Sequence, residues 1–138
     1  MTEIDRSAPI LVTGGTGYIA SWIIKQLLND GYTVHATVLK PKNMQSVSHL
    51  ERIANQAPGV LKLFKADLLN PGSFAMAAEG CELAIHTASP FIMSGIKNPH
   101  EELIRPALEG TRNVLDSVNR STSVRRVVLT SSVAAIYG

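Results

Sequence analysis

A glycine-rich segment near the amino terminus, Thr13-Gly14-Gly15-Thr16-Gly17-Tyr18-Ile19-Ala20, has the residue types that bind a phosphate. Glycine allows a tight turn and a close backbone approach, so main-chain N–H groups can reach an anion at a helix N-terminus. An apolar run, Ile10-Leu11-Val12, precedes the segment, and apolar residues at helical spacing follow it. A strand, a glycine turn and a helix in this order predict the phosphate-binding end of a dinucleotide site. A turn without a ligand is the alternative. The expected cofactor contacts in this segment are Thr13, Gly14, Thr16, Gly17, Tyr18 and Ile19.

The residues at the end of the second predicted strand, Thr37-Val38-Leu39-Lys40-Pro41-Lys42, bear on which dinucleotide binds. A carboxylate at this place binds the adenosine ribose of NAD, whereas cations receive the extra phosphate of NADP. No Asp or Glu occurs between Gly31 and Glu51. The segment therefore predicts NADP (NADPH), with Lys40 as the cation that contacts it. NAD, with the lysines merely solvated, is the alternative.

Three more segments follow predicted strands, at the edge where a dinucleotide crosses a parallel sheet. In Lys65-Ala66-Asp67-Leu68 the carboxylate of Asp67 can accept a hydrogen bond from an adenine amino group or cap a turn. In His86-Thr87-Ala88-Ser89-Pro90 the small residues leave room for ribose and diphosphate, and His86 is expected to be a core residue at a strand end. Thr130-Ser131-Ser132 offers hydroxyls to the nicotinamide or forms an ordinary turn. The further predicted cofactor contacts are Lys40, Asp67, Leu68, Thr87, Ala88, Ser89 and Thr130.

Apolar runs and helical patterns alternate along the chain and predict the elements that position these residues. Strands are expected at 10–13, 33–39, 61–65, 82–86 and 126–130, and helices at 18–29, 43–56, 70–78 and 101–119. Gly31 is expected to end the first helix, and Asn70-Pro71 to begin the short third one. The alternation implies right-handed parallel crossovers. The predicted fold is α/β, a Rossmann-type three-layer sandwich with a parallel sheet in the order 3-2-1-4-5, ending soon after the fifth strand.

Composition narrows the classes of function. A chain of 138 residues is expected to form one domain, and its net charge of +2 is too small to indicate a nucleic-acid partner. Cys81 is the single cysteine, which excludes a disulfide framework. No segment has the length of a membrane span, and the polar residues 1–9 do not resemble a signal peptide. The scattered histidines predict no metal site, and the expected location is the cytoplasm.

Several segments, taken together, resemble one family: 13–21, 65–68, 86–90, 106–111 and 125–132. They are similar to extended short-chain dehydrogenases/reductases, within the NAD-dependent epimerase/dehydratase superfamily. The similarity is strongest to reductases of the cinnamoyl-CoA reductase and dihydroflavonol reductase type, and to yeast methylglyoxal reductase-like aldehyde and ketone reductases. The spacing Gly14-x-x-Gly17-x-x-Ala20 differs from G-x-G-x-x-G in the manner of this family. The resemblance covers nearly the whole chain.

The resemblance implies that NADPH gives a hydride to the carbonyl carbon of a small molecule. In such enzymes a tyrosine protonates the carbonyl oxygen, and the lysine of Tyr-x-x-x-Lys lowers the tyrosine's pKa. A serine orients the carbonyl, and Ser132 matches that catalytic serine better than Ser131 does. Ala107 stands where many family members carry an asparagine, which favours the reductases over the sugar epimerases. A monomer or a homodimer is expected.

The chain also departs from the family pattern. Leu39 and Ser46 stand where plant relatives carry arginine and lysine, so phosphate recognition is expected to shift to Lys40. No Tyr-x-x-x-Lys occurs, and Tyr137 lies too close to Ser132 to be the family's tyrosine. Residues 1–138 are therefore expected to form the NADP-binding portion of a longer reductase and to be inactive alone. The alternatives are a sugar-nucleotide epimerase or dehydratase, and a non-catalytic NADP-binding redox sensor.

Overall fold

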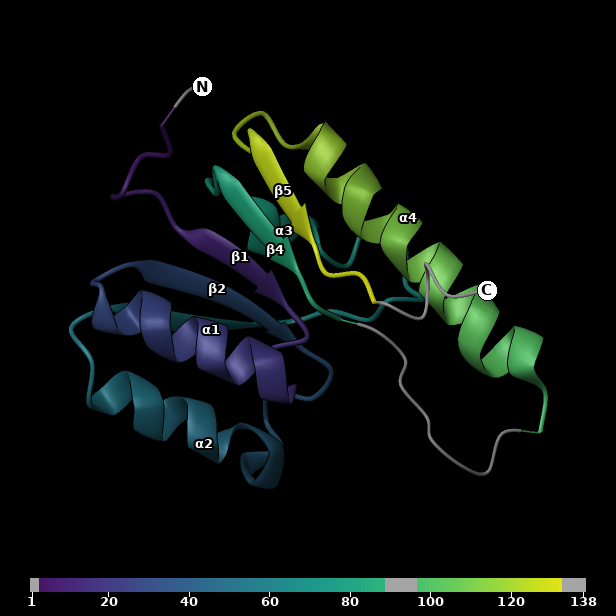
Figure 1. Ribbon diagram of the computed structural model, residues 1–138, viewed down its shortest axis with the longest axis horizontal. Coiled ribbons are helices and arrows are strands. Elements are labelled where there is room, and N and C mark those ends of the chain that lie inside the picture. Colours follow the sequence, from purple (N-terminus) through teal and green to yellow (C-terminus); the bar gives the residue numbers. More distant parts are fainter. Residues whose placement is uncertain (1–2, 89–96, 133–138) are drawn as a thin grey trace.

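The computed structural model describes residues 3–88 and 97–132, which form one parallel sheet with helices on both faces (Figure 1). The strands are β1 (Ile10–Thr13), β2 (Thr33–Val38), β3 (Val60–Lys65), β4 (Leu83–His86) and β5 (Arg126–Leu129). They are ordered β3-β2-β1-β4-β5, so the predicted order is confirmed. The helices are α1 (Tyr18–Asn29), α2 (Met44–Asn55), α3 (Ala75–Ala78) and α4 (Arg105–Arg120), with a π-helical turn η1 (His100–Ile104) before α4.

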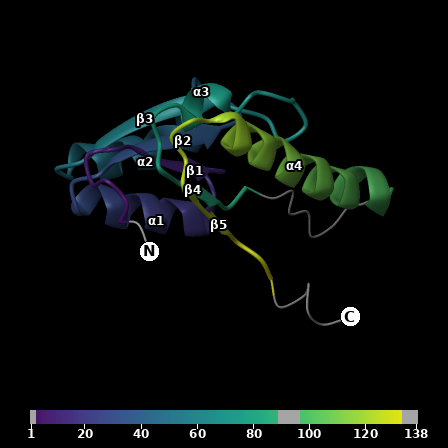
Figure 2. The ribbon, with the colours of Figure 1, turned by 90° about the horizontal axis from the view of Figure 1, so that it is seen from above.

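The central strand β1 is buried on both faces and divides the core into two layers. Ile10 and Val12 pack with α1 and α2 on one face, whereas Leu11 packs with α3 and α4 on the other. Figure 2 shows the sheet between α1 and α4. An apolar strand covered on both faces is typical of parallel sheets, because the crossover helices lie over them. Because β1 pairs in parallel with β2 and with β4, the carboxyl ends of these three strands lie at one edge.

The short third helix differs from its prediction. Asn70 and Pro71 form a turn, and α3 begins only at Ala75. Gly72 adopts a φ of +80°, outside the range of a right-handed helix, so no helix can run through it. Gly31, by contrast, follows the end of α1 with a φ of +89°, which confirms its predicted role.

The long predicted helix over 101–119 has two geometries. Its first part is the π-helical turn η1, and regular α-helix begins at Arg105. Pro106 has no N–H, and in an α-helix its ring would press against the carbonyl of Glu102. Just before Pro106 the backbone is π-helical: the N–H of Arg105 donates to the carbonyl of His100, five residues back. Pro106, in the first turn of α4, lies at the carboxyl edge of the sheet.

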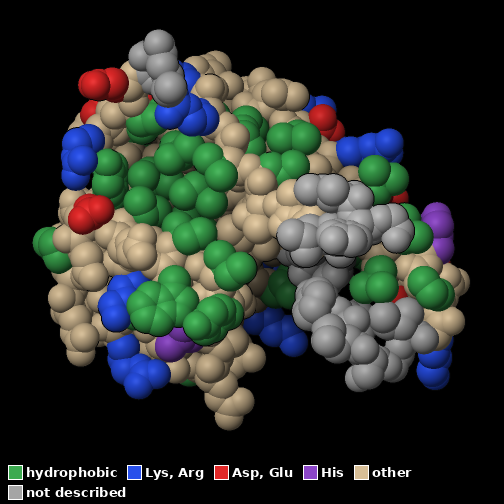
Figure 3. Space-filling view, in the orientation of Figure 1, with side chains coloured by type: hydrophobic (Ala, Val, Ile, Leu, Met, Phe, Trp, Pro, Cys, Tyr) green, Lys and Arg blue, Asp and Glu red, His purple; other side chains and the backbone are tan. Residues whose placement is uncertain are grey.

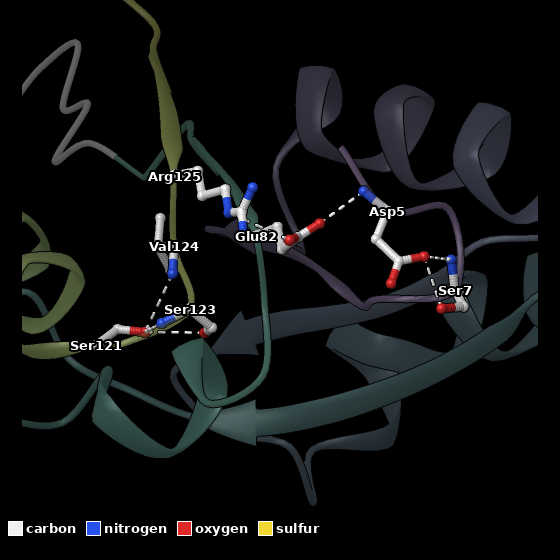
Figure 4. A network of polar contacts seen from close by, with 7 residues as sticks. All are labelled: Asp5, Ser7, Glu82, Ser121, Ser123, Val124 and Arg125. Atoms are coloured by element: carbon white, nitrogen blue, oxygen red, sulfur yellow. Dashed lines mark hydrogen bonds and ion pairs between the residues drawn. The ribbon is translucent and has the colours of Figure 1, made fainter. Parts of the chain in front are cut away.

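A polar network ties together the opposite, amino edge of the sheet (Figure 4). The carboxylate of Glu82 accepts a hydrogen bond from the Asp5 N–H at 2.6 Å and lies 3.4 Å from Nε of Arg125. The Glu82 carbonyl accepts from the backbone N–H of Arg125 at 2.8 Å. These contacts join the amino-terminal segment to the starts of β4 and β5. The network stabilises the fold at a distance from the site described below.

Hydrophobic side chains gather on one face of the molecule, over the sheet beside α1 (Figure 3). Ile19, Trp22 and Val128 are each about half exposed, at 57%, 51% and 48%. Within residues 3–88 and 97–132, no helix lies over the β4–β5 part of this face. No described helix combines the length and apolar character that a membrane crossing requires.

Candidate dinucleotide-binding site

The glycine turn between β1 and α1 is held against two other strands. Gly14 adopts a φ of +67°, and a Cβ added there would lie 2.8 Å from the Cα of Ala88. A larger residue would therefore separate the turn from the segment that follows β4. Gly15 donates its N–H to the carbonyl of Thr37 at 2.8 Å, which fastens the turn to β2. The sequence places glycine here because only glycine combines this φ with such a close approach.

The amino end of α1 opens directly from this turn. Gly17 is the N-cap, no side chain caps the helix, and its first turn carries no acidic residue. The first N–H groups of a helix lack intrahelical partners and carry the positive end of the helix dipole. Tyr18 and Ile19 occupy these first positions and are exposed at 80% and 57%. This end of α1 is thus suited to bind an anion.

A buried hydroxyl, that of Thr13, organises the segment after β4. Its Oγ1 accepts hydrogen bonds from the N–H groups of Thr87 at 3.0 Å and Ala88 at 3.1 Å, and lies 2.7 Å from Nδ1 of His86. Because both acceptor positions of the hydroxyl are occupied, its own proton is donated to Nδ1. His86 is therefore the neutral Nε2–H tautomer. Burial lowers the pKa of His86, which favours the same neutral form.

Two adjoining clefts lie along the carboxyl edge of the sheet. The first has a volume of about 370 Å³ and the second about 900 Å³. Both are lined by Gly14, Gly17, Leu68, Thr87 and Ala88, so they meet at the glycine turn. The first also includes Thr16 and Asp67, and the second Tyr18, Ile19, Thr130 and Ser132. Most of the predicted site residues are thereby brought to one groove.

Two of the predicted site residues, Thr13 and Lys40, lie elsewhere. Thr13 is 0% exposed and lies beneath the groove, where it positions Thr87 and Ala88. Lys40 is exposed just beyond β2 and lines neither cleft. Ser89 falls outside the described residues. His86 is 4% exposed at the end of β4, as expected of a core residue there, and it also borders the second cleft.

The first cleft combines apolar walls with one carboxylate. Val38, Leu39 and Phe74 supply apolar surface, and Asp67 lies at its rim. Oδ1 of Asp67 accepts the N–H of Leu69 at 2.9 Å, so the turn-capping role is present. A carboxylate has further acceptor positions, so Asp67 can still accept from an amino group. The cleft therefore suits a flat heteroaromatic ring that carries a hydrogen-bond donor.

The second cleft has hydroxyl groups at the end of β5. Thr130 donates its N–H to the carbonyl of His86 at 3.0 Å, which continues the pairing of β4 with β5. Ser131 and Ser132 follow and line the cleft together with Thr111 of α4. Within the part of the chain that the structure describes, no cluster of His, Cys, Asp and Glu could hold a metal ion. The groove thus offers backbone N–H groups, hydroxyls and one carboxylate.

Comparison with known proteins decides the family. The model of the NAD dependent epimerase/dehydratase family matches residues 10–138. The chain belongs to this family. The membership predicted from the five segments is confirmed, and the family's dinucleotide chemistry agrees with the groove at the glycine turn.

Family members of known name are similar over nearly the whole chain. The chain is 51% identical over 136 residues to cinnamoyl-CoA reductase CAD2 of Medicago truncatula, which covers 99% of this chain and 41% of the relative. It is 40% identical to dihydroflavonol 4-reductase of Gerbera hybrida, with 99% and 37% covered. The crystal structure of Gre2 from Candida albicans in complex with NADPH superposes with a TM-score of 0.77 at 32% identity, covering 93% and 38%. The chain thus spans about two fifths of the length of these relatives.

Proposed function

We propose that this chain is the dinucleotide-binding portion of an NADPH-dependent carbonyl reductase acting on a small aldehyde, ketone or acyl-CoA. The observation that carries the proposal is the groove at the carboxyl edge, where the glycine turn, the open end of α1 and two clefts meet. The relatives from Medicago truncatula and Gerbera hybrida are named as reductases, and Gre2 from Candida albicans was crystallised with NADPH.

In this proposal the pyrophosphate binds at the glycine turn. The N–H groups of Tyr18 and Ile19 at the amino end of α1 would bind it, whereas the N–H of Gly17 is donated to the carbonyl of Gly14 at 2.9 Å. Thr87 and Ala88, held from below by Thr13, form the opposite wall. Ser89 is kept in the proposal as a cofactor contact on the sequence alone.

The adenosine half would occupy the first cleft. Its apolar walls suit the adenine ring, and the carboxylate of Asp67 can accept from the adenine amino group. Leu68 lines the same cleft. The preference for NADPH is supported by the absence of Asp and Glu between Gly31 and Glu51, since an acid there would repel the extra phosphate. Lys40 lies beside the cleft residue Leu39 and would bind that phosphate.

The nicotinamide half would occupy the second cleft, near Thr130 and Ser132. NADPH, when bound there, supplies the hydride. Ser132 would donate a hydrogen bond to the substrate carbonyl and so orient it. The 138 residues contain no Tyr-x-x-x-Lys, and we propose that the general acid belongs to a part of the protein outside this sequence. Without it, the rate would fall by about 10²–10⁴.

The remaining features of the proposal concern the whole protein. A cytoplasmic location is supported by the single, buried Cys81, since a reducing compartment keeps such a thiol free. For the assembly we propose a monomer or a homodimer.

The test is a fluorescence titration of the protein with NADPH and NADH. We expect tighter binding of NADPH, and a loss of about tenfold in NADPH affinity on Lys40→Ala with NADH unchanged. Lys25→Ala is the matched control, because Lys25 is an exposed lysine of α1 that lines neither cleft. Equal or tighter binding of NADH would overturn the choice of NADPH. Failure to bind either dinucleotide would overturn the site.

A further inference from the structure

We propose that Asn113 of α4 is a positioning residue for the dinucleotide: it holds Leu68 in place and so sets the affinity for the adenosine half. This inference rests on the proposed function. Asn113 lines neither of the two clefts, so it acts only through the segment that it contacts. Leu68 lines both clefts and lies where they meet.

The contact itself is direct and short. Nδ2 of Asn113 donates a hydrogen bond to the carbonyl of Leu68 at 2.6 Å, and both residues are half-buried. Leu68 belongs to no helix or strand, so no neighbouring strand or helical turn fixes it. The segment before it is fastened at Ala66, whose N–H donates to the carbonyl of Val38 at 3.1 Å. The amide of Asn113 fixes the next part of the segment from the opposite side.

A missing side chain brings α4 close enough for this contact. A Cβ added at Gly110 would lie 2.8 Å from both Cβ and Cδ2 of Leu68, a distance that real Cβ atoms do not reach. Gly110 and Asn113 are three residues apart and therefore share one face of α4. On that side Val114 and Val118 are buried in the core, which fixes the helix against the sheet. Gly110 thus sets the approach of the helix, and Asn113 fastens the segment to it.

The consequence falls on the first cleft. Asp67 and Leu69, the neighbours of Leu68, both line it. If the amide of Asn113 is lost, the carbonyl of Leu68 loses its fixed partner and the segment can shift. Asp67 keeps its own bonds to Ser73, whose Oγ accepts from the Asp67 N–H at 3.1 Å and donates to its carbonyl at 2.9 Å, so the displacement falls on Leu68 and Leu69. Ligands that contain adenosine should bind more weakly even though every residue of the cleft is unchanged.

The test compares Asn113→Leu and Asn113→Asp with Asn119→Leu. Leucine and aspartate both resemble asparagine in size, and neither the leucine side chain nor an ionised carboxylate can donate to a carbonyl. Asn119 is an exposed asparagine of the same helix and is the matched control. Each variant is titrated with NADPH and with adenosine 2′,5′-bisphosphate, which represents the adenosine half. Urea unfolding gives the folded fraction at the titration temperature.

We expect both Asn113 variants to bind both ligands about tenfold more weakly as folded proteins, with the control unchanged. Gly110→Ala, which pushes Leu68 from the side, should weaken the same two ligands. Unchanged affinity in a folded Asn113 variant would overturn the inference. So would a loss that merely follows the unfolded fraction. If the unsubstituted protein binds neither ligand, the proposed function fails instead.

Discussion

Replacing Thr13 by valine tests how the groove is held from below. Valine has nearly the same shape and equally favours a strand, so β1 and its packing are preserved. The substitution removes only the hydroxyl, which is 0% exposed and bonds to Thr87, Ala88 and His86. Any effect therefore reports these three hydrogen bonds rather than a cavity.

The structure sets the size of the effect. A buried polar group that loses its partner costs about 1–3 kcal/mol. The N–H groups of Thr87 and Ala88 are only half-buried beside a groove, so water can replace part of their loss. His86 is buried, and its Nδ1 would be left without a donor. We expect Thr13→Val to lower the free energy of unfolding by about 2–4 kcal/mol.

Urea unfolding at neutral pH measures this loss, provided that the m-value is unchanged. Thr13→Ser is the control, because it keeps the hydroxyl and removes only a methyl group, at a cost of about 0.5–1.5 kcal/mol. The order of stability should be threonine, serine, valine. If the valine variant were as stable as the wild type, or more stable than the serine variant, the hydroxyl would not organise the segment after β4. NADPH binding should weaken in the same order.

Three further predictions concern the glycine turn and two buried side chains. Gly14→Ala should destabilise the fold by about 2–4 kcal/mol and weaken NADPH binding at least tenfold, because it adds a clash with Ala88 to its backbone strain. Gly31→Ala has a positive φ but open space, so it should cost about 1 kcal/mol and leave the dissociation constant unchanged; equal effects of the two variants would contradict this. Burial lowers the pKa of His86 below its unfolded value of 6.5, so its contribution to stability is fully present above pH 6.5 and is lost as the pH falls through the folded pKa. Urea unfolding of the wild type should show this fall in the free energy of unfolding at low pH. The His86→Asn variant, whose Oδ1 can still accept from Thr13, should show a smaller fall. Parallel pH profiles of the two proteins would contradict the assignment of the fall to His86. Burial raises the pKa of the Cys81 thiol to about 12, so iodoacetamide should label this thiol at about pH 8 only after urea is added. Mass spectrometry measures the labelling. Rapid labelling of the folded protein would contradict the prediction and show that the thiol is accessible.

The parts of the fold that depend only on residues close together in the sequence could be predicted. The bounds of β1 and α1 match the prediction because an apolar run, a glycine turn and a helical pattern follow one another there. The short helix was predicted too early because Pro71 also occurs in turns, and the φ of Gly72 decides between them. The π-helical turn before Pro106 was not predicted, since the apolar spacing of a helix does not distinguish its backbone geometry.

The candidate site was predicted in its types of residue but not in its contacts. Glycine, small residues and hydroxyls after strands were sufficient to select most of the groove, because strand ends of a parallel sheet meet at one edge. Asn113 gave no signal in the sequence. Its partner Leu68 lies 45 residues away and becomes its neighbour only because Gly110 lets α4 approach. A search of the sequence for a glycine one helical turn before an asparagine would have found Gly110 and Asn113. It would also have found many other pairs that make no such contact.

The sequence by itself determined the order of the elements, the family and the position of the glycine turn. These depend on periodicity, on glycine and on short motifs, which are local properties of the chain. Tertiary structure alone decided which groups are partners: the Thr13 hydroxyl with His86, 73 residues away, and the Asn113 amide with the Leu68 carbonyl. The physical reason is that a hydrogen bond requires a distance near 3 Å and a defined direction, and packing fixes both only after helices and sheet have assembled.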